Sequence, residues 1–212
     1  MLISLLLWAA FASSASAELA LKQVLNGLEI TRVSEFRYIE TREMKLLNRI
    51  SVAEGRMYVS PERMAIEQTK PGQALILIAA NRLQYLEPSR GIRFVKPLNG
   101  PLAVPGIGSF LGLLRAQMSL EQLQTQFLIE LEHSEKHWKI ILLPREQVDT
   151  SRMVISGLRG RGANLLELGY IDGDVTTWAL SLVSEGPEAQ QNMDALLKLA
   201  ETLSQPDLTT EH

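Results

Sequence analysis

The sequence predicts a mainly β domain of the α+β class, in which a curved antiparallel sheet forms an incomplete β-barrel with helices over its concave face. Three observations predict it. Apolar residues recur with a period of two through most of residues 33–183. Proline and glycine turns separate these short segments, which is typical of an antiparallel meander. Helical spacing occurs only near the start, the middle and the end of the chain, and a curved sheet must fill its interior with side chains, helices or ligand.

The composition limits which classes of protein and of chemical site are compatible with this chain. The chain has 212 residues, of which 46% are hydrophobic, so it suits one domain with a real core. Its net charge of −3 argues against a protein built to bind nucleic acid or an acidic membrane surface. It has no cysteine, which excludes disulfides, thiolate metal sites, a cysteine nucleophile and lipid anchoring through an N-terminal cysteine.

The first residues are typical of an export signal. Residues 1–12 are almost all apolar, and as a helix they would span about 18 Å against the ~30 Å of a bilayer core. Small residues follow, and Ala15-Ser16-Ala17 has the form that signal peptidase cuts. No Lys or Arg precedes the apolar run, but the run has no polar face that a buried first helix would need. We expect a signal peptide over residues 1–17, cleavage after Ala17 and a periplasmic location.

In the first half of the mature chain, the sequence predicts a helix followed by a meander of antiparallel strands. Leu21, Val24 and Leu25 follow helical spacing, which predicts an amphipathic helix over residues 18–30. Alternation then predicts strands, in chain order, over residues 33–45, 54–59, 63–67, 74–80, 83–86 and 92–95. Lys70-Pro71-Gly72, Asn81-Arg82 and Arg90-Gly91 mark turns between them.

The middle of the chain interrupts this pattern. Prolines and glycines make residues 96–105 an irregular loop, and the apolar stretch Gly106–Met118 reads as a helix. Ser119 and Gln122 have the spacing of a capping box, which predicts a further short helix. Strands resume at residues 127–132, 138–143, 152–158, 164–171 and 175–183, and a helix follows from Pro187 to Leu203. We expect nine or ten strands in all.

No motif points to catalysis, a metal or a cofactor. The glycines of 106–112 have the wrong spacing and context for a dinucleotide loop. His133 and His137 flank a predicted hairpin turn and are read as solvated turn residues, and Asp172 and Asp174 belong to a tight turn. No G-x-S-x-G elbow is present. We therefore predict no catalytic residue, no metal ligand, no cofactor and no enzymatic activity; a hydrolase with an unrecognised site stays a minor alternative.

What remains is a surplus of apolar residues, enough to line one concave face of the sheet, although the sequence does not fix which set of alternate residues faces inward. They could line a ligand cavity or fill an ordinary sandwich core, and periodicity alone does not decide between the two. Their methionines would give a cavity wall that adapts to ligands of different shape. The strand residues concerned are Phe36, Tyr38, Met57, Val59, Met64, Ile76, Ile78, Phe127, Ile129, Trp138, Ile140 and Trp178.

Several stretches together resemble a known family. They are the G-x-x-x-x-x-P-x-x-[LM] element at Gly55–Met64, the hairpin at Ala74–Leu86, the mid-chain helix, the W-x-[IL]-x-L-x-P element at Trp138–Pro144, and the strand pair that ends at the Asp172-Gly173-Asp174 turn. In this order the chain resembles the LolA-like carriers of the bacterial periplasm, most closely the divergent ones found with aryl-polyene and related lipid-export systems. The resemblance covers roughly residues 19–183.

The resemblance implies a half-barrel domain over residues 18–183, with a C-terminal helix and tail over 184–212 as an addition. It implies a hydrophobic cavity for the acyl chains of a lipid or lipoprotein, lined by the strand residues above and by Phe110, Leu113 and Leu114, with Gly106–Met118 as its gate. A monomeric carrier would pass cargo from an inner-membrane exporter to an outer-membrane acceptor. Ser60 stands where the lipoprotein carriers have an arginine, which puts lipoprotein in doubt as cargo. The alternative is an envelope interaction or sensor module with a self-filled core.

Overall fold

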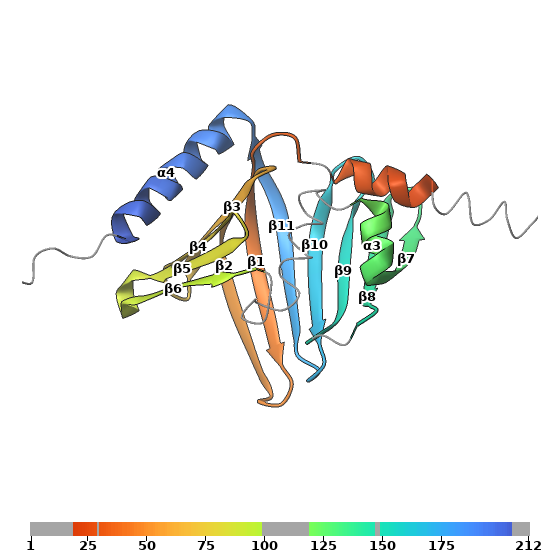
Figure 1. The fold of residues 1–212 in the computed structure, drawn as a ribbon, viewed down its shortest axis with the longest axis horizontal. Helices are drawn as coiled ribbons and strands as arrows, with labels where there is room; N and C mark the ends of the chain where they lie inside the picture. The colour runs from red at the N-terminus through yellow and green to blue at the C-terminus, as the bar shows by residue number, and fades with distance from the viewer. Residues whose placement is uncertain (1–18, 29, 99–118, 147–148, 205–212) are drawn as a thin grey trace, which may run out of the picture.

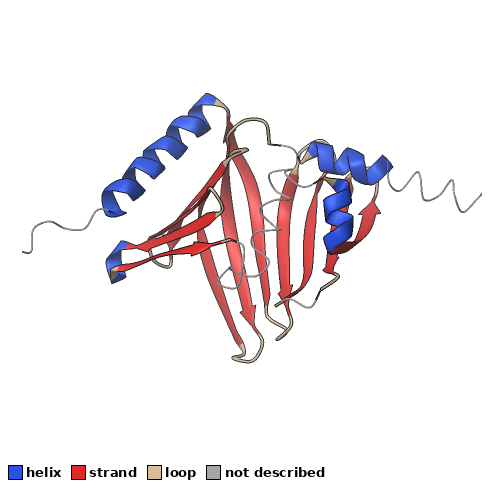
Figure 2. Cartoon of the chain, in the orientation of Figure 1, coloured by secondary structure: helices blue, strands red, loops and turns tan. Residues whose placement is uncertain are grey.

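A computed structural model describes residues 19–28, 30–98, 119–146 and 149–204 (Figure 1). Eleven strands form one sheet: β1 Ser34–Met44, β2 Arg49–Val59, β3 Arg63–Lys70, β4 Ala74–Ala79, β5 Arg82–Glu87, β6 Ile92–Pro97, β7 Phe127–His133, β8 His137–Pro144, β9 Thr150–Leu158, β10 Ala163–Tyr170 and β11 Val175–Glu185. Residues 19–27 are helical, a 3₁₀ turn η1 covers Pro88–Arg90, and two further helices are α3 Leu120–Gln126 and α4 Pro187–Ser204 (Figure 2).

The sheet is antiparallel, curved and open. Its strand order is β6-β5-β4-β3-β2-β1-β11-β10-β9-β8-β7, so the first and last strands pair at its centre. The edge strands β6 and β7 do not pair with each other, and the two halves of the sheet bend towards one another without closing (Figure 1). The predicted fold class, a mainly β incomplete barrel, is confirmed.

The expected total of nine or ten strands is wrong: the described residues form eleven, one in each of the eleven segments where alternation predicts a strand. The long β1–β2 hairpin also departs from the prediction. Its register runs from Ser34↔Val59 to Met44↔Arg49, so β2 begins five residues before the predicted strand. Residues 49–53 alternate as well, with Ile50 and Val52 on one face, but both side chains are exposed, so backbone hydrogen bonds and not the core hold this end of the hairpin.

Two local predictions are confirmed in atomic detail. Ser119 Oγ accepts the Gln122 backbone N–H at 3.2 Å, and Gln122 Oε1 accepts the Ser119 N–H at 2.9 Å, so the capping box begins α3. Gly173 has φ of +87°, and the Asp174 N–H bonds to Asp172 Oδ1 at 3.0 Å, so the predicted turn joins β10 to β11.

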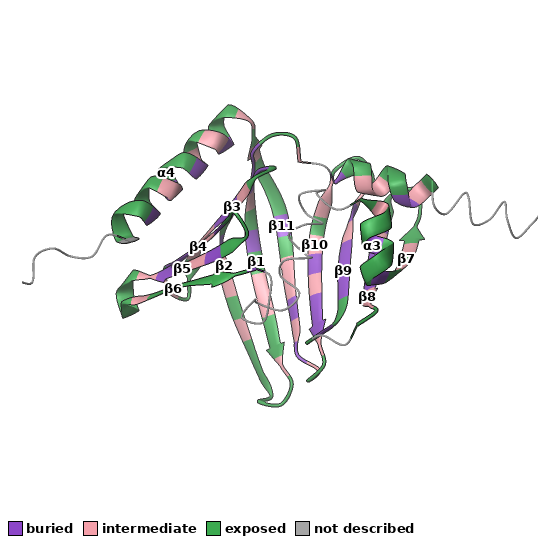
Figure 3. Ribbon diagram, in the orientation of Figure 1, coloured by how far each residue is buried: buried purple, intermediate pink, exposed green. Residues whose placement is uncertain are grey.

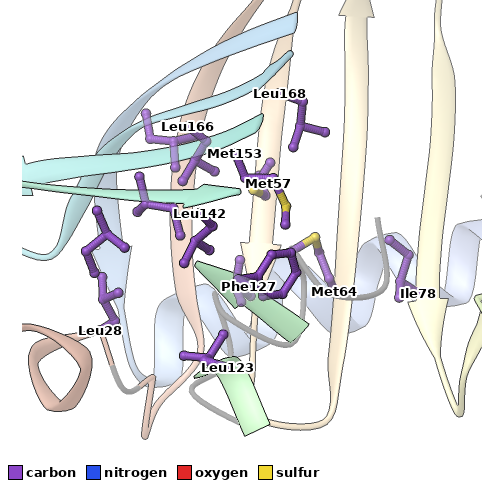
Figure 4. Packing of buried hydrophobic residues seen from close by; sticks show 14 of the residues in the cluster. Leu28, Met57, Met64, Ile78, Leu123, Phe127, Leu142, Met153, Leu166 and Leu168 are labelled. Atoms are coloured by element: carbon purple, nitrogen blue, oxygen red, sulfur yellow. The ribbon is translucent and has the colours of Figure 1, made fainter. Parts of the chain in front are cut away.

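The two faces of the sheet carry separate cores (Figure 3). The inner face holds the larger core, which alternate residues of most strands share with Leu21 and Leu28 from the N-terminal segment and Leu123 of α3. Figure 4 shows Leu123 and Phe127 lying beneath the methionine and leucine side chains of the strands. The helix over residues 19–27 and α3 therefore cover the inner face, as predicted.

The helix α4 lies on the opposite, outer face (Figure 1). It contacts β1, β3, β5 and β11. Its buried residues Ala189, Met193, Leu196 and Ala200 pack with Val33, Tyr58, Ala65, Leu75 and Leu86. Because these strand residues alternate with those of the inner core, the C-terminal helix closes the back of the sheet.

A buried carboxylate fastens α4 to the sheet. Glu35 of β1 is 1% exposed. Its Oε1 accepts Arg56 at 2.7 Å, and its Oε2 accepts Ser184 at 3.1 Å and Asn192 of α4 at 2.9 Å. Burial raises the pKa of Glu35, but the hydrogen bonds from Asn192 and Ser184 and the charge of Arg56 outweigh burial, so the pKa lies below its ordinary value.

The turn between β2 and β3 is closed by Ser60. Ser60 is buried; its Oγ donates to the Arg63 carbonyl at 2.9 Å and accepts the Arg63 N–H at 3.0 Å. The Arg63 guanidinium bonds to Asp194 of α4 at 3.1 Å. Ser60 therefore closes a turn here, and Arg63 connects that turn to the C-terminal helix.

Candidate ligand-binding site

The main hollow of the molecule lies where two central strands separate. β10 and β11 pair only from Gly169↔Val175 to Leu165↔Ala179. Residues 180–185 of β11 continue beside β1 alone. The segment after the N-terminal helix and the β9–β10 turn border the resulting gap, which encloses about 890 Å³. This volume falls within the roughly 300–1,000 Å³ typical of small-molecule sites.

The wall of the main hollow is mixed, with nine apolar residues beside six polar or charged ones. Met57 and Val59 of β2 form part of it and are buried, as is Leu180 of β11. Leu182 of β11 is 53% exposed, although it lies opposite Phe36 in the β1–β11 register. The remaining apolar lining residues are Leu28, Ile30, Phe36, Leu158 and Ala163. Several of these side chains also belong to the inner core, so the hollow is continuous with it.

Charged and polar groups lie in the same lining. Arg32 comes from the segment before β1, and Arg161 comes from the β9–β10 turn. Glu185 supplies the one carboxylate among the lining residues and accepts the Ser34 hydroxyl at 3.4 Å. An apolar wall that carries two guanidinium groups suits an amphiphilic ligand better than a purely apolar one.

Two smaller hollows adjoin the β7–β8 hairpin. One, of about 140 Å³, shares Gly27, Gly160 and Gly162 with the main hollow and also touches Trp138 and Arg159. Another, of about 360 Å³, lies beside the hairpin and also touches Trp138. His133 ends β7 and His137 begins β8, as the predicted hairpin required, and both border these two hollows.

The structure brings together every predicted cavity residue that it describes. All twelve belong to the inner core or pack against it. Phe36, Met57 and Val59 line the main hollow, and Trp138 lines the smaller ones. The others belong to the core or pack against it and line none of these three hollows: Tyr38, Met64, Ile76, Ile78, Phe127, Ile129, Ile140 and Trp178. Phe110, Leu113, Leu114 and the proposed gate at 106–118 fall outside the described residues, and ligand contact by any of the fifteen stays a prediction.

Sequence reasoning missed several residues that line the main hollow. Leu180 and Leu182 share the strand parity of Trp178, so extending that alternation would have found them. Thr31 and Arg32 follow the predicted helix and carry no pattern. The turn Arg159-Gly160-Arg161-Gly162 offered a signal, because its two glycines at positive φ hold an open turn between strands.

One carboxylate belongs to the inner face. Glu40 of β1 is half-buried and accepts the Trp178 indole N–H at 2.8 Å. Burial raises the pKa of Glu40, and the Trp178 hydrogen bond and the charge of Arg42 only partly offset this. Burial likewise raises the pKa of the neighbouring Tyr38 hydroxyl. These groups favour uncharged contents on the inner face.

Within the described ranges, no group of three or more His, Asp or Glu side chains could hold a metal ion. None of the helices in the same ranges has the length and apolar composition needed to cross a membrane. The fold and the site together define an open, curved β-sheet domain with a ligand-sized hollow on its inner face.

Comparison with known proteins adds distant likenesses of fold. No family model and no curated protein matches the sequence. A DUF1329 family protein from Desulfovibrio piger is 11% identical, with a TM-score of 0.40 over 79% of this chain and 90% of its own. A LolA superfamily protein from Nitrosomonas europaea is 9% identical, with a TM-score of 0.39 over 79% and 94%.

A third solved structure is a putative outer membrane lipoprotein-sorting protein domain from Vibrio parahaemolyticus. It is 12% identical, with a TM-score of 0.39 over 84% of this chain and 97% of its own. Likenesses this distant say nothing about what the chain binds, and the association with aryl-polyene export stays a prediction.

Proposed function

We propose that this chain is a periplasmic carrier that holds an acyl chain of a lipid or lipoprotein in the main hollow. It would receive this cargo from an inner-membrane exporter and pass it towards an outer-membrane acceptor, as a monomer and without catalysis. The observation that carries the proposal is the main hollow itself: about 890 Å³, walled by Met57, Val59 and Leu180 and open beside Leu182.

The energetics suit a carrier that must also release its cargo. Each methylene transferred from water contributes about 0.8 kcal/mol, so ten would give roughly 8 kcal/mol before costs. Association and ordering remove several kcal/mol of this. The net affinity is therefore moderate, and an acceptor with a deeper apolar site could take the acyl chain.

A matched pair of substitutions in β11 tests the proposal. Leu182 and the next residue, Val183, are both 53% exposed, but only Leu182 lines the main hollow. Leu182→Asp places a carboxylate on the part of the wall that the acyl chain would cover. We expect it to weaken binding of a fluorescent fatty alcohol at least tenfold, because an acyl chain that covers a carboxylate removes it from water at a cost well over ~1.4 kcal/mol. Val183→Asp should leave binding within a factor of two.

Equal affinities for the wild type and Leu182→Asp would contradict acyl binding in the main hollow. Thermal unfolding of both variants controls for a loss of fold. Because both side chains are exposed, their melting temperatures should stay close to that of the wild type.

The second candidate is an envelope interaction or sensor module with a self-filled core. One observation favours it: predicted cavity residues such as Met64 and Ile140 are 1% exposed and pack into the core, and they line none of the three hollows described above. Such a module would bind no acyl probe in the wild type, so the same titration separates the two candidates.

A further inference from the structure

We propose that the ligand of the main hollow is an anionic amphiphile, whose phosphate-class head group is bound by Arg32 and Arg161 while its acyl chain follows the apolar wall. This inference rests on the proposed function and adds the chemistry of the cargo's head group.

The two arginines reach the main hollow from segments far apart in the chain. Arg32 precedes β1 on one side, and Arg161 belongs to the β9–β10 turn on the other. Both are exposed. Among the described residues, neither forms an ion pair. The two guanidinium groups are thus available to a ligand, and a phosphate can accept hydrogen bonds from both.

The charges around the main hollow favour an anion. Among the described residues, two arginines and Glu185 are the charged groups that line it, which leaves one net positive charge. The adjoining hollow of about 140 Å³ adds Arg159, and no carboxylate lines it. A cationic border beside an apolar wall matches an acyl chain that ends in a negative head group.

The β9–β10 turn leaves space for such a head group. Gly160 and Gly162 have φ of +76° and +71°, and no atom lies within 4 Å of where a Cβ would stand on either. Glycine adopts this backbone without strain. Arg159 and Arg161 therefore alternate with two residues that carry no side chain, and their backbone is accessible from outside.

Competition with matched lipids tests the proposal. The purified protein is loaded with a fluorescent neutral acyl glycerol, which is displaced by oleoyl lysophosphatidic acid or by monooleoylglycerol. These competitors share one acyl chain and differ in the phosphate. We expect the phosphate lipid to compete roughly tenfold better at low salt, and the difference to shrink at high salt because exposed charges are screened.

Each arginine is then replaced singly. Arg32→Gln and Arg161→Gln should each lower the affinity for oleoyl lysophosphatidic acid several-fold and leave the affinity for monooleoylglycerol unchanged. The control Arg37→Gln removes the same charge from an exposed position in β1 that does not line the main hollow, so it should change neither lipid affinity. Inorganic phosphate alone should not displace the probe or remove the preference.

The outcomes separate the two proposals. Equal competition by both lipids would overturn the proposal of an anionic head group but would leave the proposal of acyl-chain binding standing. A parallel loss of both lipids in the arginine variants would also overturn it, because the arginines would then act on the fold. Failure of the neutral probe to bind would overturn the carrier function itself. Binding of inorganic phosphate with the same arginine dependence would assign these groups to free phosphate and not to a lipid.

Discussion

Replacing Met193 in α4 should lower stability and leave the main hollow intact. Met193 is fully buried against the outer face of the sheet. Met193→Ala removes a buried thioether side chain from a helix that cannot easily collapse onto strands β3 and β5. Large-to-small changes of this kind cost about 2–5 kcal/mol, and we expect about 3. For a domain of this size that lowers the melting temperature by roughly 6–12 °C.

The assay is urea unfolding followed by circular dichroism, with a control variant in the same helix. Leu199 is 41% exposed, so Leu199→Ala should cost less than about 1 kcal/mol. Because α4 packs on the face opposite the main hollow, folded Met193→Ala should bind an acyl probe as the wild type does. Equal destabilisation by both variants, or loss of probe binding in folded Met193→Ala, would refute this assignment of α4.

Three further predictions concern charge and space. Glu35→Ala should lower the free energy of unfolding by about 2–4 kcal/mol at neutral pH in urea, since it leaves the donors around a buried carboxylate without an acceptor. Because the pKa of Glu35 is lowered in the folded protein, the stability difference between wild type and variant should shrink as the pH falls below the ordinary value of 4.5. Glu40→Gln should raise the free energy of unfolding at pH 7, because the raised pKa of Glu40 means that burying its charge costs stability. The difference in unfolding free energy between variant and wild type should disappear as the pH falls towards 4.5, and a difference independent of pH would refute this. Gly157→Ala should cost at least about 2 kcal/mol in the same assay, because its Cβ would lie 2.6 Å from the Trp138 ring, whereas Gly72→Ala has open space and should be nearly neutral.

Local chemistry made much of the fold predictable. The capping box at Ser119 and the turn at Asp172-Gly173-Asp174 depend on residues within a few positions of one another, and both form as expected. Period-two alternation grouped the described cavity candidates, and the structure places all of them in or against one core; which set of alternate residues faces inward was not predictable from the sequence. Even at Trp138–Leu143, where both faces are apolar, the structure turns Trp138 and Ile140 inward.

What the sequence could not predict depends on contacts between distant segments. The main hollow exists because β11 leaves β10 at Ala179 while it continues beside β1, and no local pattern marks that point. The apolar stripe of α4 predicts that the helix packs against the sheet, but it does not predict on which face of the sheet. The buried Glu35 looks like any exposed strand carboxylate until Asn192 of α4 is placed beside it.

The central claim, that this chain carries an acyl lipid, is tested most directly by native mass spectrometry of the protein isolated from the periplasm, followed by organic extraction. A carrier shows a discrete added mass that extracts as an acyl lipid and is lost in Leu182→Asp but kept in Val183→Asp. A clean mass of the protein alone, unchanged after incubation with envelope lipids, would contradict the carrier function and favour the interaction module with a self-filled core.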